Sequence, residues 1–192
     1  MLSTLSLLAS LAFQQVALEA VPTELAPLVR QVRGLAQHAS SQPHLEKALT
    51  AATRATEAED LQEKLDPAAL LEIRINPEGR VKVARGLGAT TLETGKPIAV
   101  LVKVVNGSGG QQRLKPILKC PGEPTPPVTA AWLEKTPGLG QDLNGLLVEY
   151  RLLLLTGQRP GLFEITFAME AGQGTQDIGF RGETPLLVRV KP

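Results

Sequence analysis

This chain contains two long apolar runs, LLVEYRLLLL at residues 146–155 and LFEITFAME at residues 162–170, which are its strongest strand signals. The segment TGQRPG at residues 156–161 separates them and carries a Pro-Gly pair, which is typical of a turn. Two strands around a tight turn predict a central β-hairpin against which the other strands pack. We expect both faces of this hairpin to be largely covered, with Glu149 and Arg151 as its only solvated patch.

Strand-like patterns continue on both sides of this hairpin. Apolar and polar residues alternate over residues 71–75 and again over 81–84, with the turn NPEG between them, which predicts a second hairpin. Further strands are predicted by the apolar runs at residues 98–105, 114–118 and 186–190, of which the second contains Pro116 and is expected at a sheet edge. Strands at this spacing predict a mainly β domain over residues 67–192, built as an antiparallel β-sandwich of immunoglobulin-like or jelly-roll-like kind. The alternative is a partly open barrel.

The chain before residue 67 has a different character. Of the 18 glycines in the whole sequence, only Gly34 precedes residue 67. The composition therefore favours helices before residue 67 and turns after it. Apolar residues recur at a spacing of three and four from Leu25, and a second helix is predicted over residues 44–65. Residues 21–66 are therefore expected to form an α-helical hairpin, whose thin apolar stripes should dock on another part of the protein.

The first twenty residues have features of a secretory signal peptide. Residues 5–13 form an apolar stretch that is too short to cross a membrane but has the length of a signal-peptide core. Ala17 and Ala20 are candidate cleavage neighbours, so we expect loss of residues 1–20 and export to the periplasm or cell surface. No Lys or Arg precedes Arg30, and the alternative is an amphipathic first helix that is retained in a cytoplasmic protein.

The composition argues against several classes of function. The formal net charge is +1 and only 3% of residues are aromatic, so we expect no binding of nucleic acid. Cys120 is the single cysteine, which excludes an intramolecular disulfide. The histidines His38 and His44 are separated by Pro43 and lack the spacing of a metal site, and no G-x-S-x-G motif occurs. We therefore predict no catalytic residues, no metal site and no cofactor.

The most distinctive polar string is GQGTQD at residues 172–177. It lacks the Lys-Ser/Thr pair and the following helix of a phosphate-binding loop, so a tight loop closed by its own hydrogen bonds is expected. Loops on rigid β domains are also where ligands commonly bind. The alternative is a ligand-binding loop formed by Gln173, Thr175, Gln176, Asp177 and Arg181, with Asp177 as the candidate contact to a ligand or an ion.

Three strings together resemble a known module. Residues 70–86, 143–151 and 167–181 are similar to a β-sandwich module near the N-terminus of exported, uncharacterised planctomycete proteins. In some of those proteins a metal-dependent hydrolase domain of the amidohydrolase/PHP kind follows. The resemblance covers residues 70–190 and implies export and the sandwich fold. No hydrolase domain follows within the 192 residues, so the resemblance implies no enzyme activity here.

These observations favour a non-enzymatic exported module that binds a protein or a component of the cell envelope. Two alternatives stay open. The first is an accessory domain that works with a separate metallohydrolase. The second is a structural assembly unit of the cell envelope, in which the helical hairpins of different copies pair. We expect no transmembrane segment in the mature chain.

Overall fold

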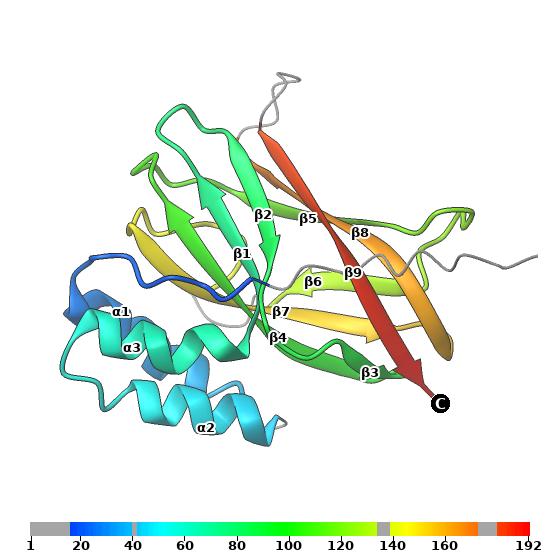
Figure 1. Ribbon diagram of the computed structural model, residues 1–192, viewed down its shortest axis with the longest axis horizontal. Coiled ribbons are helices and arrows are strands. Elements are labelled where there is room, and N and C mark those ends of the chain that lie inside the picture. The colour runs from blue at the N-terminus through cyan, green and yellow to red at the C-terminus, as the bar shows by residue number, and fades with distance from the viewer. Residues whose placement is uncertain (1–15, 40–41, 134–138, 173–179) are drawn as a thin grey trace, which may run out of the picture.

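The computed structural model describes residues 16–39, 42–133, 139–172 and 180–192. Strands make up most of the regular structure in these residues, which confirms the prediction of a mainly β protein. Three α-helices precede the strands within the described ranges (Figure 1): α1 Leu25–Ala36, α2 Pro43–Ala52 and α3 Ala58–Leu65. The short 3-10 helix η1, Asp66–Ala68, then leads directly into the first strand.

The described residues form nine strands. In chain order they are β1 Ala69–Ile75, β2 Val81–Arg85, β3 Thr91–Glu93, β4 Pro97–Asn106, β5 Leu114–Lys119, β6 Val128–Trp132, β7 Val148–Gly157, β8 Gly161–Ala171 and β9 Arg181–Lys191. They are arranged in two sheets. Sheet A has the strand order β2-β1-β4-β7-β6, and sheet B has the order β3-β9-β8-β5.

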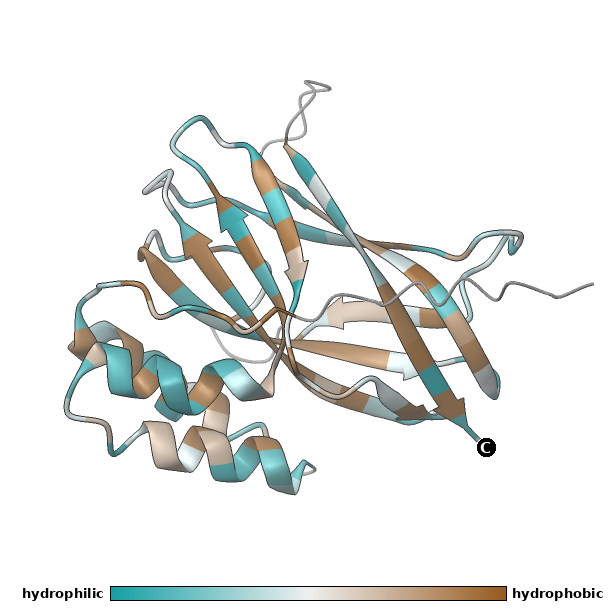
Figure 2. Ribbon diagram, in the orientation of Figure 1, coloured by the Kyte–Doolittle hydropathy of each residue, from teal (hydrophilic) through white to brown (hydrophobic). Residues whose placement is uncertain are grey.

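The two sheets share one apolar core. Both contribute to it, for example through Ile73 and Val104 from sheet A and Phe167 and Val188 from sheet B. The period of two along each strand turns one face inward, as the alternation of apolar and polar residues along β2 shows (Figure 2). A Cβ atom at Gly182 would lie only 2.7 Å from the carbonyl oxygen of Val81, so glycine allows β9 to pass close to β2.

The predicted central hairpin is wrong, because β7 and β8 lie in different sheets. β7 pairs antiparallel with β4 on one edge and with β6 on the other, which leaves no free edge for β8. β8 instead pairs with β5 and β9. Residues 158–160 therefore carry the chain from one sheet to the other. At this crossing a Cβ atom on Gly157 would lie 2.4 Å from the Val190 side chain of β9.

Other strand predictions are confirmed, although the sheets are mixed rather than purely antiparallel. β1 and β2 form the predicted hairpin, and β5, which contains Pro116, lies at the edge of sheet B. The two parallel pairs are β1 with β4 and β3 with β9. A tight turn cannot join parallel strands, so the chain passes through β2 and β3 before β4 returns beside β1.

The helical region differs from the predicted two-helix hairpin. The expected second helix is interrupted between Ala52 and Ala58, which separates α2 from α3. Thr53 follows α2 directly, and its hydroxyl donates a hydrogen bond to the carbonyl oxygen of Thr50 at 2.8 Å. Such a local bond from a β-branched residue competes with helix continuation.

The helices dock on the outer face of sheet A, as their thin apolar stripes predicted. A second apolar core joins side chains from all three helices to this face, and it includes Leu28, Val32, Leu49, Leu61, Leu65, Leu101, Val148 and Leu152. The apolar stripes are therefore occupied within the chain. No helix that the structure describes is both long enough and apolar enough to cross a membrane.

An N-terminal segment, residues 16–21, also lies across the outer face of sheet A, between the helices and β2 (Figure 1). The backbone nitrogen of Val16 donates a hydrogen bond to the carbonyl oxygen of Arg85 at 3.0 Å. Leu18 and Val21 pack against the second apolar core. Residues 16–20, which the sequence assigns to a removable leader, thus make contacts with the folded protein.

Candidate functional site

The structure describes only one residue of the predicted binding loop. Gln173, Thr175, Gln176 and Asp177 lie outside the described residues. Arg181 is the first residue of β9, its side chain is 33% exposed, and its Nη2 atom lies 3.6 Å from the Glu183 carboxylate. In the described parts of the chain, no group of three or more His, Cys, Asp and Glu side chains lies close enough to hold a metal ion.

A cluster of buried charged and polar groups lies between the helices and sheet A. Lys103 on β4 and Tyr150 on β7 are direct cross-strand neighbours, and Asp66 of η1 faces both. The ammonium group of Lys103 lies 2.6 Å from Asp66 Oδ2, and the Tyr150 hydroxyl donates to Asp66 Oδ1 at 2.6 Å. The exposed fraction is 0% for Lys103 and Tyr150 and 5% for Asp66, so water reaches this cluster poorly.

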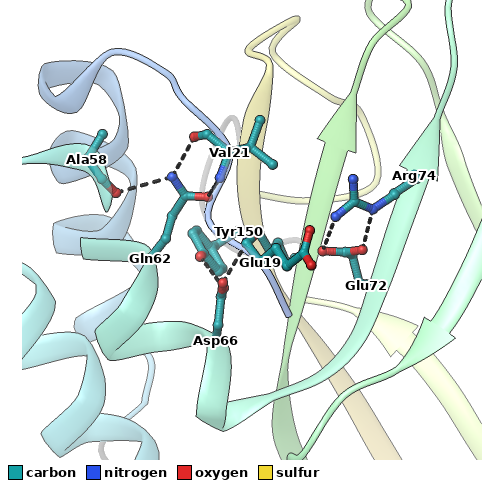
Figure 3. A network of polar contacts seen from close by, with 9 residues as sticks. Glu19, Val21, Ala58, Gln62, Asp66, Glu72, Arg74 and Tyr150 are labelled. Atoms are coloured by element: carbon teal, nitrogen blue, oxygen red, sulfur yellow. Dashed lines mark hydrogen bonds and ion pairs between the residues drawn. The ribbon is translucent and has the colours of Figure 1, made fainter. Parts of the chain in front are cut away.

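Two further contacts fasten the N-terminal segment to this cluster. The Lys103 ammonium also donates to the backbone carbonyl oxygen of Glu19 at 2.8 Å. Gln62 of α3 is completely buried, and its amide binds both backbone groups of Val21, at 2.9 Å from the nitrogen and 2.8 Å from the oxygen (Figure 3). Buried side chains of β4 and α3 therefore hold residues 19 and 21 in place.

Burial dominates the protonation equilibria of the cluster. Loss of contact with water raises the pKa of Asp66, and the hydrogen bonds from Lys103 and Tyr150 offset this effect only in part. The same loss of water, together with the negative charge of Asp66, raises the pKa of Tyr150 well above its ordinary value. Tyr150 therefore acts as a hydrogen-bond donor at neutral pH, and the cluster joins η1 to β4 and β7.

A cleft of about 280 Å³ opens beside this cluster, between the N-terminal segment and the first hairpin. Glu72 and Arg74 project into it from β1, and Lys82 is the cross-strand partner of Arg74 on β2. The complete lining is Val16, Ala17, Leu18, Glu19, Glu72, Arg74, Lys82 and Ala84. The cleft is thus built from a segment and a hairpin that are far apart in the sequence.

The cleft carries charges of both signs. Arg74 donates from Nε and Nη2 to the two carboxylate oxygens of Glu72, at 2.5 and 3.2 Å. These hydrogen bonds, with the negative charges of Glu72 and Glu19, raise the pKa of Arg74. The Glu19 carboxylate also turns toward Glu72 (Figure 3). Arg74 nevertheless keeps 43% of its side chain exposed, so it can contact a ligand while it stays bound to Glu72.

Lys82 is a second exposed cation of the cleft. It lies on the solvent side of β2, and among the described residues it makes no salt bridge. Cations at the rim and carboxylates along the wall form an arrangement that complements a ligand with charges of both signs. The alternation in the sequence placed Glu72, Arg74 and Lys82 on one solvated face. It gave no signal for Glu19, which was expected to leave with the leader.

A second buried ion pair lies on the opposite face of β7. Glu149 and Arg151 contact each other and are both 0% exposed, so the prediction of a solvated patch is wrong. The loop at residues 140–146 folds over the pair. Glu149 accepts from the backbone nitrogens of Asn144 and Leu146, and Arg151 donates to the carbonyl oxygens of Gly140 and Asp142. The pair therefore fixes a loop and has no group directed at solvent.

No protein-family model and no curated protein matches this chain. The resemblance to a module of exported planctomycete proteins therefore stays a prediction.

Proposed function

We propose that this chain is a non-enzymatic exported module that binds a peptide segment, presented by a protein or by the cell envelope, in the cleft between residues 16–19 and the β1–β2 hairpin. The observation that carries this proposal is the presence of charges of both signs in a solvent-accessible cleft. In contrast, the buried clusters at Asp66 and Glu149 have hydrogen-bond partners within the chain. Export is supported by the apolar stretch at residues 5–13. The proposal requires that the mature chain keeps residues 16–19, so a leader would have to end before Val16 rather than at residue 20.

The charges of the cleft define the chemistry of the ligand. Lys82 and Arg74 favour a carboxylate near the rim, whereas Glu19 favours a cationic group beside the N-terminal segment. A volume of about 280 Å³ is small for a ligand pocket and suits one or two amino-acid residues. The proposed ligand is therefore a peptide segment in which an acidic side chain lies next to a basic one.

Titration of the isotope-labelled protein with acetyl-Lys-Asp-amide, followed by NMR, tests this proposal. We expect saturable shifts of the backbone amide signals of Leu18, Arg74 and Lys82, and no such shifts with acetyl-Ala-Ala-amide. Lys82→Gln should weaken binding roughly two- to fivefold, the range expected for one solvent-exposed charge pair.

Arg80→Gln is the matched control, because it removes one positive charge from the same hairpin but Arg80 does not line the cleft. It should leave the affinity unchanged. Equal losses in the Lys82 and Arg80 variants would show that only the general charge of the hairpin matters. An absence of shifts at millimolar peptide would contradict the cleft as the binding site.

We also propose that the two sheets form a β-sandwich. The core shared by the two sheets supports a β-sandwich, while the immunoglobulin-like or jelly-roll-like assignment stays a prediction. The accessory-domain and assembly-unit alternatives stay predictions too. The apolar stripes of the helices already pack against sheet A. Pairing between copies of the protein would therefore have to use the polar outer faces of the helices.

A further inference from the structure

Gln62 of α3 is a buried polar residue whose side chain binds the N-terminal segment. Its amide accepts a hydrogen bond from the backbone nitrogen of Val21 at 2.9 Å and donates one to the Val21 carbonyl oxygen at 2.8 Å. The same amide donates to the carbonyl oxygen of Ala58, one turn earlier in α3, at 3.2 Å. Both ends of the amide are therefore occupied. A side chain fixed in this way holds Val21 in one backbone orientation.

A second anchor acts on Glu19, two residues earlier in the chain. The fully buried Lys103 ammonium donates to the Glu19 carbonyl oxygen at 2.8 Å, so this peptide group is held from the interior. The Glu19 residue is exposed and lines the cleft, whereas Gln62 and Lys103 do not line it. The two anchors therefore act on a ligand in the cleft through the segment that carries Glu19.

The position of Glu19 is unfavourable for its own charge, because it faces the Glu72 carboxylate in the same cleft (Figure 3). Like charges repel, and water screens this repulsion only in part at a cleft wall. Both carboxylates act on one guanidinium, that of Arg74, which already binds Glu72 through two hydrogen bonds. This wall keeps its excess of negative charge as long as Glu19 stays in place. A loosened segment would let Glu19 move away from Glu72.

We propose that Gln62 and Lys103 are positioning residues that give the cleft its preference for a ligand with a cationic group. They hold the backbone at residues 19 and 21, and this keeps the Glu19 carboxylate at the cleft wall. The inference rests on the proposed function, because it concerns the ligand of the same cleft. It goes further in assigning the selectivity to buried side chains that the ligand does not touch.

Two peptides that differ in one cationic side chain test this inference on the full chain. They are acetyl-Lys-Asp-amide and acetyl-Ala-Asp-amide, and NMR titration gives both dissociation constants. The wild type should bind the lysine peptide roughly two- to fivefold more tightly, the range for one exposed charge pair. Gln62→Met keeps a long side chain but removes the amide that holds Val21. It should abolish the preference and change the affinity for the alanine peptide by less than about twofold.

Gln31→Met is the matched control. Gln31 is a buried glutamine of α1, and its amide oxygen accepts from the backbone nitrogen of Tyr150 at 2.6 Å rather than from the N-terminal segment. This variant loses a buried amide as well, but it should keep the preference for the lysine peptide. Glu19→Gln should abolish the preference, and adding Gln62→Met to it should change the preference no further, because the two residues act as a unit.

Hydrogen exchange of the wild type provides a readout that does not depend on the folding of any variant. If docking of the segment favours a cationic ligand, that ligand must favour docking by the same factor. Exchange of the Val21 amide should therefore slow by roughly two- to fivefold at saturating lysine peptide, and it should not slow with the alanine peptide.

The possible results separate the positioning role from the binding site. Equal slowing of Val21 exchange by the two peptides would overturn the inference while leaving the cleft as the binding site. A preference for the lysine peptide that survives in Gln62→Met would do the same. An absence of binding by both peptides would overturn the proposed function and, with it, this inference.

Discussion

At Asp66, burial and hydrogen bonding act on one carboxyl group in opposite directions. Burial raises its pKa from the ordinary value of 3.8, and the bonds from Lys103 and Tyr150 reverse this only in part. Between 3.8 and the raised value, the folded protein binds more protons at Asp66 than the unfolded chain does. The stability contributed by this group therefore falls as the pH rises through that window.

A comparison of the wild type with Asp66→Asn isolates this effect, since asparagine does not titrate. The difference in unfolding free energy, wild type minus variant, should decrease as the pH rises above about 3.8. Urea denaturation at a series of pH values measures it. Glu123→Gln, which removes an exposed carboxylate, serves as the control. A difference that increases with pH would mean that the bonds from Lys103 and Tyr150 outweigh burial.

Arg151 offers a second test at the scale of single residues. Arg151→Met should destabilise the fold by about 3–5 kcal/mol, because it leaves the Glu149 carboxylate buried without a counterion. Arg113→Gln breaks an exposed ion pair with Asp142 in the same loop and should cost less than about 1 kcal/mol. Chemical denaturation compares the two variants. Similar values would show that the buried pair contributes no more than a surface pair.

At the scale of elements, β8 contains both a core residue and an exposed one of similar hydrophobicity. Phe167 is 0% exposed and belongs to the core between the sheets, so Phe167→Ala should cost about 3–5 kcal/mol. Leu162 is 56% exposed, and Leu162→Ala should change stability by no more than about 0.5 kcal/mol. Denaturation midpoints of the two variants, each compared with the wild type, measure this difference. A small effect of Phe167→Ala would mean that β8 does not organise the core.

The sequence predicted the positions of the strands better than it predicted which strands pair. The period of two located β1, β2 and β9, and Pro116 correctly indicated an edge strand. The prediction that β8 pairs with β7 was wrong. Proximity in the sequence favours a hairpin, and no local signal indicates that β4 and β6 occupy the two edges of β7. Glu149 and Arg151 were wrongly predicted to be exposed for a related reason. The sequence pattern of charged residues in a strand is the same whether their hydrogen-bond partners are water molecules or the backbone of a folded loop.

At the scale of the whole molecule, the sequence predicted that the helices dock but not what they cover. Thin apolar stripes require a partner, and that partner is the outer face of sheet A. The cleft could not be predicted, because one wall comes from residues 16–19 and the other from a hairpin more than fifty residues later. The predicted loop at residues 173–177 lies outside the described residues, and its role stays a prediction.

The pairing of β3 with β9 has a consequence for synthesis of the protein. Thr94 and Lys191, which are hydrogen-bonded at this end of sheet B, are 97 positions apart in the chain. A nascent chain cannot complete sheet B until its final strand has left the ribosome, since β9 lies between β3 and β8. Closing such long loops is slow compared with forming a local hairpin. During that interval the edge of β8 that pairs with β9 lacks its partner strand, so its backbone groups stay unpaired until the end of β9 is available.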